Sequence, residues 1–249
     1  MNQTSDNLKE YAVWDGSVRW FHWINVLAII GLIAVGTVIL NGKAIGVSGE
    51  GKVLLKTIHV YIGYVFCLNL LWRLIVAFVS GNRFSRWGSI LPTGAGFCGR
   101  IGEYIKAAKA GQAPSYLGHN PMGRLMVSLL FAVLTIMAIT GLVLAGTDVY
   151  MPPFGALFAD WVTGGDAEKL AQLVPGSKEF VDKELYGEMR AFRKPFIKTH
   201  YFVFFVLLGA VVLHIAAVVI AEQREKNGLV SAMFSGRKVF SEKPVDLDE

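Results

Sequence analysis

Four long apolar segments constrain this chain more than any other feature. The uninterrupted runs cover approximately residues 18–40, 57–79, 125–145 and 199–221, and polar or charged residues close each of them. A helix of roughly 20 apolar residues crosses about 30 Å of hydrocarbon, because it rises about 1.5 Å per residue. The chain is 53% hydrophobic and only 17% charged. We therefore expect an all-α protein, an integral membrane four-helix bundle.

The segments between the runs indicate how the chain is oriented. We expect one membrane domain over residues 1–249, with an outer loop at 147–198 and a tail at 222–249. The connection between the second and third runs is strongly basic, with Glu103 opposed by Arg83, Arg86, Arg100, Lys106, Lys109 and Arg124. The positive-inside rule places this connection, the tail and both termini in the cytoplasm. A multi-pass membrane protein with no nucleic-acid partner is expected.

Short helices are expected outside the spans. Residues 99–110 place Ile101 and Ile105 on one face and basic residues on another, which is typical of a helix on an anionic membrane surface and equally of a solvated connector. In the outer loop, residues 166–174 and 177–192 have weak helical patterns. Cys67 and Cys98 are isolated, and the chain has no CxxCH or CxxC motif, so covalent haem, zinc and iron–sulfur sites are not indicated.

Four of the five histidines lie within the apolar runs, where ionisable groups are costly and usually functional. In an antiparallel bundle, His59 and His200 lie at the same height near the outer surface. His214 follows His200 by fourteen residues, which is about 21 Å along a helix and a return to nearly the same face. It thus reaches the height of His22. The sequence predicts an outer pair, His59 with His200, and an inner pair, His22 with His214.

Two imidazoles from facing helices at equal depth are what a six-coordinate haem iron requires. The pairs therefore predict two haem b groups, one above the other, with all four histidines as iron ligands. A single one of these histidines is equally compatible with a hydrogen bond to a neighbouring helix. The glycines of these helices could let a macrocycle approach the backbone or could simply pack the helices together; they are Gly36, Gly63 and Gly209.

Two arginines are candidate partners of the haem propionates. Arg73 follows His59 by fourteen residues, which places it at the inner level on the same helix face. Snorkelling to the membrane surface is the alternative role for this side chain. Arg19 lies three residues before His22 and so on its face. His119 precedes Asn120 and Pro121, which read as the N-cap and first residue of the third span. This histidine is expected in a capping turn or beside a quinone.

The stretches VWDGSVRWFHW, KTIHVYIGYVFCLNLLWRLIVAFV, LGHNPMG and KTHYFVFFVLLGAVVLH resemble the bacterial four-helix cytochrome b family over about residues 11–225. That family includes the b-type cytochrome subunits of nickel–iron hydrogenases and the gamma subunits of formate dehydrogenases. The resemblance implies haem b ligation by His22, His59, His200 and His214 in the bacterial cytoplasmic (inner) membrane. It also implies electron transfer between a periplasmic redox partner and the quinone pool.

The outer loop, at residues 147–198, is longer than a hydrogenase cytochrome would need. A c-type cytochrome or another periplasmic reductase is therefore as good a partner prediction as a hydrogenase. On this interpretation the chain is an electron-transfer subunit of a membrane oxidoreductase complex. Two other functions are open from the sequence: a free-standing oxidoreductase that reacts with superoxide or quinone, and a haem-free transporter.

Overall fold

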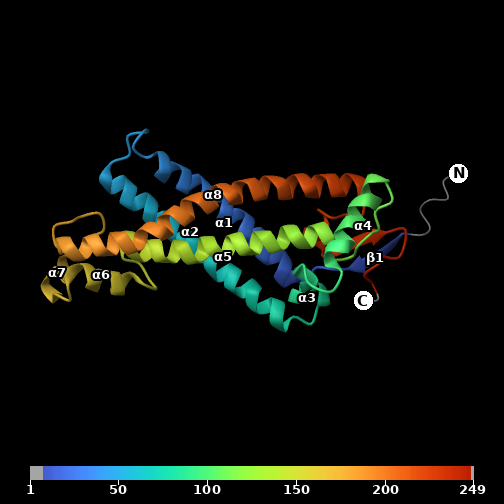
Figure 1. The fold of residues 1–249 in the computed structure, drawn as a ribbon, viewed down its shortest axis with the longest axis horizontal. Helices are drawn as coiled ribbons and strands as arrows, with labels where there is room; N and C mark the ends of the chain where they lie inside the picture. Colours follow the sequence, from blue (N-terminus) through green and yellow to red (C-terminus); the bar gives the residue numbers. More distant parts are fainter. Residues whose placement is uncertain (1–7, 248–249) are drawn as a thin grey trace. The chain divides into compact units, whose positions relative to one another are not determined.

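A computed structural model describes residues 8–247 of the chain. Four long helices dominate it (Figure 1): α1 (Gly16–Asn41), α2 (Gly49–Val79), α5 (Pro121–Val149) and α8 (Lys183–Glu225). All four are long and apolar enough to cross a membrane, and each contains one predicted span. The prediction of an all-α membrane protein with four long apolar helices is confirmed.

The helices extend beyond the apolar runs, because hydropathy detects the lipid-facing part of a helix and not its ends. α8 begins at Lys183 rather than near residue 199. The Asp182 carboxylate starts it by accepting hydrogen bonds from the backbone N–H groups of Glu184 and Leu185, at 2.9 and 3.0 Å. α5 begins at Pro121 as predicted, and the Asn120 side chain accepts a hydrogen bond from the Gly123 N–H at 2.8 Å.

Shorter helices occupy the connections. Between α2 and α5 lie η1 (Arg83–Ser85), α3 (Trp87–Ile90) and α4 (Phe97–Lys109), and α4 shows that residues 99–109, for which a surface helix and a solvated connector were both open, are helical. The outer loop contains α6 (Gly155–Thr163), which was not predicted, and α7 (Ala167–Gln172). α7 and the start of α8 fall in the two stretches with helical patterns, and non-helical residues 173–182 separate them. The outer loop is thus largely helical.

Contacts divide the described chain into two compact units. The terminal unit comprises residues 8–23, 71–132 and 207–247, and the central unit comprises residues 24–70 and 133–206. Buried side chains of the terminal unit centre on Trp14, Phe84 and Leu117, and those of the central unit on Phe158 and Val162. Each unit therefore has its own core.

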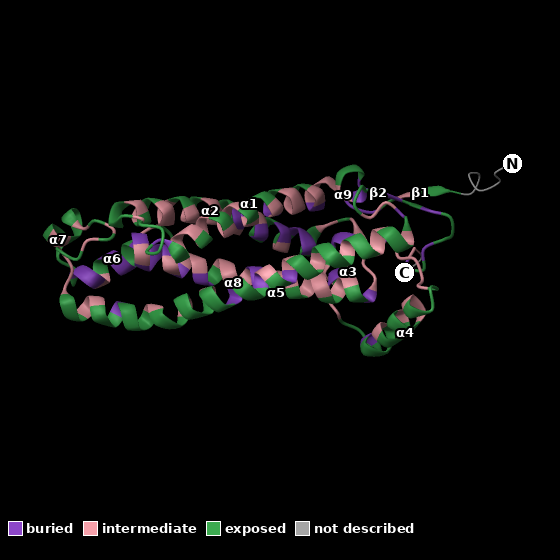
Figure 2. Ribbon diagram, turned by 90° about the horizontal axis from the view of Figure 1, so that it is seen from above, coloured by how far each residue is buried: buried purple, intermediate pink, exposed green. Residues whose placement is uncertain are grey.

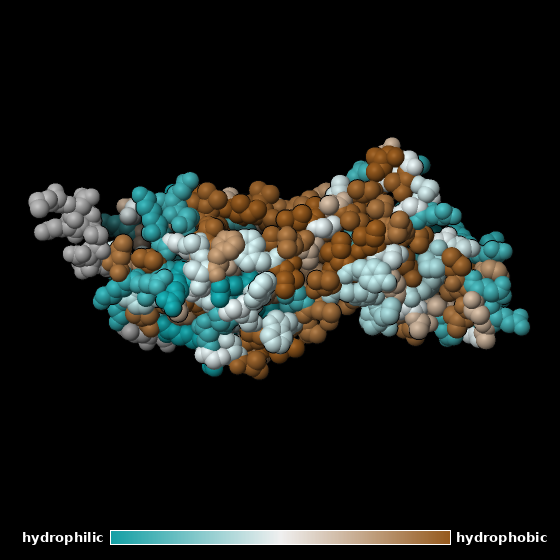
Figure 3. All heavy atoms as spheres, turned by 180° about the vertical axis from the view of Figure 1, so that it is seen from behind, coloured by the Kyte–Doolittle hydropathy of each residue, from teal (hydrophilic) through white to brown (hydrophobic). Residues whose placement is uncertain are grey.

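The long helices expose most of their apolar surface. Only 11–28% of the most apolar window of each helix is buried inside the protein, and exposed residues recur along these helices in Figure 2. Apolar side chains cover much of the surface seen in Figure 3. A water-soluble protein rarely exposes large apolar patches, whereas lipid is a suitable environment for them. The protein is a multi-pass membrane protein.

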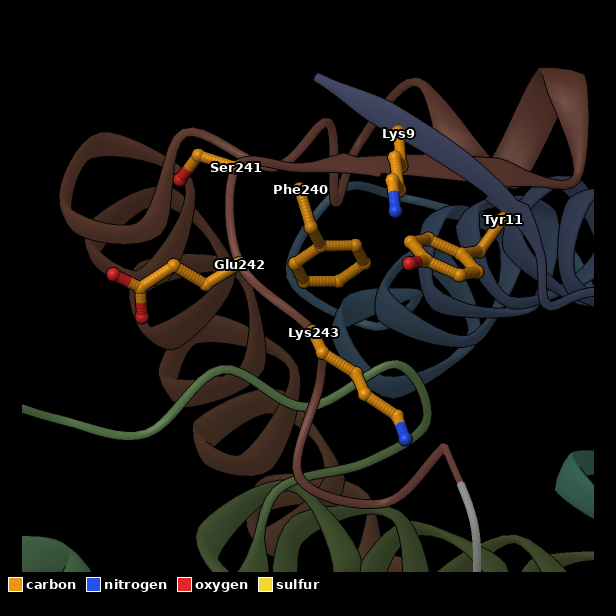
Figure 4. Close-up of a pocket in the computed structure, with 6 residues that line it drawn as sticks. All are labelled: Lys9, Tyr11, Phe240, Ser241, Glu242 and Lys243. Atoms are coloured by element: carbon orange, nitrogen blue, oxygen red, sulfur yellow. The ribbon is translucent and has the colours of Figure 1, made fainter. Parts of the chain in front are cut away.

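Segments near both ends of the described residues form a small cap that the sequence did not reveal. Strand β1 (Lys9–Ala12) pairs antiparallel with β2 (Arg237–Phe240), and the short helix α9 (Ala232–Ser235) precedes β2. Tyr11 and Phe240 bring their rings edge to face across the strands, as Figure 4 shows. We call residues 9–14, 115–119 and 227–247 the terminal cap. Residues 222–249 were predicted only as a tail, yet their described part folds back onto the protein.

Candidate functional site

The four histidines of the spans divide between the two units as the predicted pairs require. His59 and His200 both belong to the central unit, whereas His22 and His214 both belong to the terminal unit. All four residues are half-buried. In residues 8–247, no group of three or more His, Cys, Asp or Glu side chains could hold a metal ion. Histidines in twos suit a metal whose remaining ligands come from a macrocycle.

The outer pair has the separation that one metal ion between two imidazoles needs. The ring centroids of His59, on α2, and His200, on α8, are 6.4 Å apart, and their planes are inclined by 75°. Two metal–nitrogen bonds of about 2 Å, with about 1.2 Å from each nitrogen to its ring centroid, give roughly 6.4 Å. The residues present therefore fit a haem iron held from two sides.

Two glycines let neighbouring helices approach the outer imidazoles closely. A Cβ atom added to Gly36, on α1, would lie 3.3 Å from Cε1 of His59. One added to Gly141, on α5, would lie 3.5 Å from Cε1 of His200. The contact at Gly36 is tighter than usual, so a side chain there would push the His59 ring aside, whereas the contact at Gly141 is an ordinary van der Waals contact. Gly36 therefore packs against His59 of the outer pair, and its approach to a macrocycle stays a prediction.

The ring nitrogens of the outer pair have different surroundings. Nδ1 of His200 lies 2.8 Å from the hydroxyl oxygen of Thr140, on α5. That hydroxyl also donates to the carbonyl of Ile136 at 2.7 Å. Nδ1 of His59 is buried and has no hydrogen-bond partner within residues 8–247. Only one of the two imidazoles is therefore held by a polar contact with another helix.

The inner pair lies within the terminal unit. His22, on α1, lies within electrostatic range of His214, on α8. Nδ1 of His22 is buried without a hydrogen-bond partner among the described residues. The ring contacts Trp23 edge-on at 5.1 Å between centroids, and the Trp23 indole N–H donates to the carbonyl of Met233 at 3.0 Å. The helix turn that carries His22 is thus attached to the terminal cap.

The two predicted arginines occupy different environments in the terminal unit. Arg73 is only 3% exposed, donates to the carbonyl of Ser85 at 3.0 Å and lies 5.7 Å from the centroid of the Phe131 ring. It is buried, so it does not snorkel to the surface. Arg19 donates to the carbonyl of Phe234 in the terminal cap, and its Nε is buried without a partner within residues 8–247. Arg19 therefore keeps an unused donor.

His119 lies in the terminal cap, where its ring stacks on Trp14 at 4.8 Å between centroids. Burial, and to a smaller extent the neighbouring cations Lys238, Arg73 and Arg124, lower the pKa of His119 to about 3. The imidazole is consequently neutral at physiological pH. It interacts electrostatically with His214 as well, and it directly precedes the capping residue Asn120 of α5.

Several polar residues near the histidines were not predicted. Asp148, on α5, accepts salt bridges from Lys56 of α2 and Arg193 of α8, each at 2.5 Å, and fastens three helices of the central unit. Lys56 lies three residues before His59 on the same helix. Lys238, which is 1% exposed, donates to the carbonyls of Tyr116 and Gly118 beside His119. No local motif marks these contacts, because each joins distant parts of the chain.

The pocket drawn in Figure 4 lies apart from these residues. It belongs to the terminal unit and is formed around the two terminal strands. Its lining contains none of the predicted site residues; it consists of Lys9, Tyr11, Phe240, Ser241, Glu242 and Lys243.

A family model and several known proteins that resemble the chain all point to one family. A family model described as prokaryotic cytochrome b561 matches residues 13–236. The chain is 36% identical over 155 residues to the probable Ni/Fe-hydrogenase 1 B-type cytochrome subunit of Escherichia coli; the match spans 58% of this chain and 64% of that relative, just under two thirds. It is 27% identical to the probable Ni/Fe-hydrogenase B-type cytochrome subunit of Rhizobium leguminosarum, over 93% of this chain and 90% of that relative. It is 24% identical to the subunit of the same name of Cupriavidus necator, over 95% of this chain and 90% of that relative. No solved structure matches the chain.

Proposed function

The chain belongs to the prokaryotic cytochrome b561 family, and on that premise we propose that it is a di-haem b-type cytochrome. It would transfer electrons across the bacterial cytoplasmic membrane between a periplasmic redox partner and the quinone pool. The separation of 6.4 Å between the outer imidazoles is the observation that carries this proposal. The inner pair supports it, because His22 and His214 belong to the same unit and interact electrostatically.

Each group of residues would have a defined role. A bound haem b supplies the one-electron chemistry of its iron. His59 and His200 would hold the outer haem, and His22 and His214 the inner haem. Arg73 and Arg19 would bind the propionates of the inner haem, since a guanidinium forms bidentate hydrogen bonds with a carboxylate.

The rest of the chain would insulate the electron path and fix its geometry. Apolar spans keep water and ions away from the ligands, which lowers the local dielectric constant. The salt bridges of Asp148 fasten α2, α5 and α8 within the central unit. The neutral His119 cannot donate a proton as an imidazolium at physiological pH. Beside a quinone it would therefore act as a hydrogen-bonding group.

The partners follow from the relatives and from charge. The relatives are named as B-type cytochrome subunits of Ni/Fe hydrogenases, so a hydrogenase is the favoured periplasmic partner, and a c-type cytochrome is the alternative. The basic connection that contains α3 and α4 would face the cytoplasm together with both termini. α6 and α7 would then form part of the outer surface. We propose a single membrane cytochrome domain, because all four long helices contribute residues to both units.

Purification of the protein from membranes tests this function. We expect two haem b groups per polypeptide by pyridine haemochrome assay, two components in a redox titration, and reduction of both by an added quinol. Affinity purification of the tagged protein in gentle detergent should recover hydrogenase subunits. A purified, folded protein with no redox-sensitive Soret band would contradict the proposal and favour a haem-free transporter. Superoxide-dependent quinone reduction without any partner would favour the free-standing enzyme.

A further inference from the structure

The third span contributes no histidine, yet α5 contacts the outer histidine of α8 at two successive residues. Thr140 places its hydroxyl oxygen 2.8 Å from Nδ1 of His200. Gly141 packs beside the same ring, since an added Cβ would lie in van der Waals contact with Cε1, at 3.5 Å. Thr140 itself is buried, at 5% exposure. One turn of α5 therefore provides both a packing contact and a polar contact to the imidazole of His200.

The hydrogen-bond chemistry determines which ring nitrogen remains available. Thr140 occupies Nδ1 of His200, so Nε2 is the nitrogen left for a metal. A neutral imidazole carries one proton, and with Nε2 bound to iron that proton must lie on Nδ1. The ring then donates, the Thr140 oxygen accepts, and the hydroxyl proton of Thr140 is free for the Ile136 carbonyl at 2.7 Å. The two donors in this series of hydrogen bonds, Nδ1–H of His200 and the hydroxyl of Thr140, therefore each have an acceptor.

We propose that Thr140 is a positioning residue for the outer haem, which accepts a hydrogen bond from Nδ1–H of His200 and so fixes the ring with Nε2 directed to iron. This inference rests on the proposed function. Partners of this kind orient a metal-bound histidine and make it a stronger electron donor to the metal. A stronger donor favours the oxidised iron, so the contact lowers the midpoint potential of the outer haem. Nδ1 of His59 has no such partner in the described chain, so His200 is the ligand through which the midpoint potential is lowered.

Three variants test the inference in the purified full-length protein. Thr140→Val keeps the shape and removes the acceptor, Thr140→Ser restores a hydroxyl, and Thr147→Val is the matched control. Thr147 lies on the same helix, is 4% exposed and donates to the Val143 carbonyl at 3.1 Å. His59→Ala identifies the redox component that belongs to the outer haem. The measurements are haem content, potentiometric titration and the low-temperature EPR spectrum of the oxidised protein.

We expect Thr140→Val to shift the outer midpoint potential in the positive direction and to change the outer EPR signal, with the inner haem unchanged. Haem retention at the outer site should fall about 10- to 100-fold. Thr140→Ser should restore both properties, and Thr147→Val should resemble the wild type. If Thr140→Val fails to accumulate, Thr140→Ala is measured against Thr140→Ser in the same way.

Two results would overturn the inference, and they differ from each other. An outer haem in Thr140→Val with the potential, content and EPR signal of the wild type refutes the role of Thr140 alone. A folded wild-type protein that binds no haem at the outer site refutes the proposed function, and the role of Thr140 with it.

Discussion

Acid should loosen the terminal cap through His119. Burial and the cations Lys238, Arg73 and Arg124 hold the pKa of this histidine at about 3 in the folded cap. Its ordinary pKa is 6.5, which applies once the cap has opened. Well above pH 6.5 the ring is neutral in both states and contributes nothing. As the pH falls below 6.5, the open state binds a proton and the closed state does not, so opening is favoured until about pH 3.

The size of the effect follows from the two pKa values. At pH 5 the open state is favoured by a factor of about 30. The pH is then roughly 1.5 units below the pKa of the open-state histidine, whereas the closed-state histidine is hardly protonated. This factor corresponds to about 2 kcal/mol. The cap amides that report on it are hydrogen bonded: the N–H groups of Leu117 and Gly118 donate to the Asp246 carboxylate at 2.6 and 2.8 Å.

Hydrogen–deuterium exchange with mass spectrometry measures this opening. Protection factors of peptides from residues 9–14, 115–119 and 237–247, corrected for intrinsic exchange rates, are compared at pH 7.5 and pH 5. We expect up to about 30-fold loss of protection in the wild type. His119→Gln removes the titrating group, so its loss should be much smaller, and peptides of α6 provide an internal reference. Equal losses of cap protection in the wild type and in His119→Gln would refute the reasoning.

Three further changes have expected outcomes. Burial lowers the pKa of Lys238 to about 8 from 10.5. Between these pH values the open cap holds more protons than the closed cap, so protection of the cap amides from exchange should rise with pH. Lys238→Met should abolish this rise. Gly36→Leu should displace the ring of His59, which lies 3.3 Å from an added Cβ, and reduce haem content from two to one, whereas Gly187→Ala, which meets nothing within 4 Å, should not. Arg73→Gln should shift the inner midpoint potential in the negative direction, because a buried positive charge favours the reduced haem, and Arg73→Lys should shift it less.

The features that could be predicted depend on regular geometry. Apolar runs of sufficient length indicate helices, and the fixed rise of a helix converts sequence positions into heights. His59 and His200 were predicted to meet, and the structure brings their rings together. The same arithmetic predicted Arg73 at the inner level, and Arg73 belongs to the same unit as His22 and His214. The ligand roles of these residues stay predictions.

The features that were missed depend on contacts between distant residues. β1 and β2 pair residues that are more than two hundred positions apart, and neither strand has a strong local pattern. The hydroxyl of Thr140 donates to its own helix, as it could in any span, so the sequence does not indicate its second contact with His200. The beginning of α8 was predicted only as a separate weak helix: residues 183–198 are too polar to register as part of the fourth span, yet they continue it as one helix.

Haem content of two single variants tests the central claim most directly. The claim is that imidazoles from three helices hold two irons at two levels. His200→Ala and His214→Ala, purified in parallel with the wild type, should each retain one haem b, and redox titration should show that a different component is lost in each. Unchanged haem content in both folded variants, or loss of the same component from both, would contradict the assignment of the ligands.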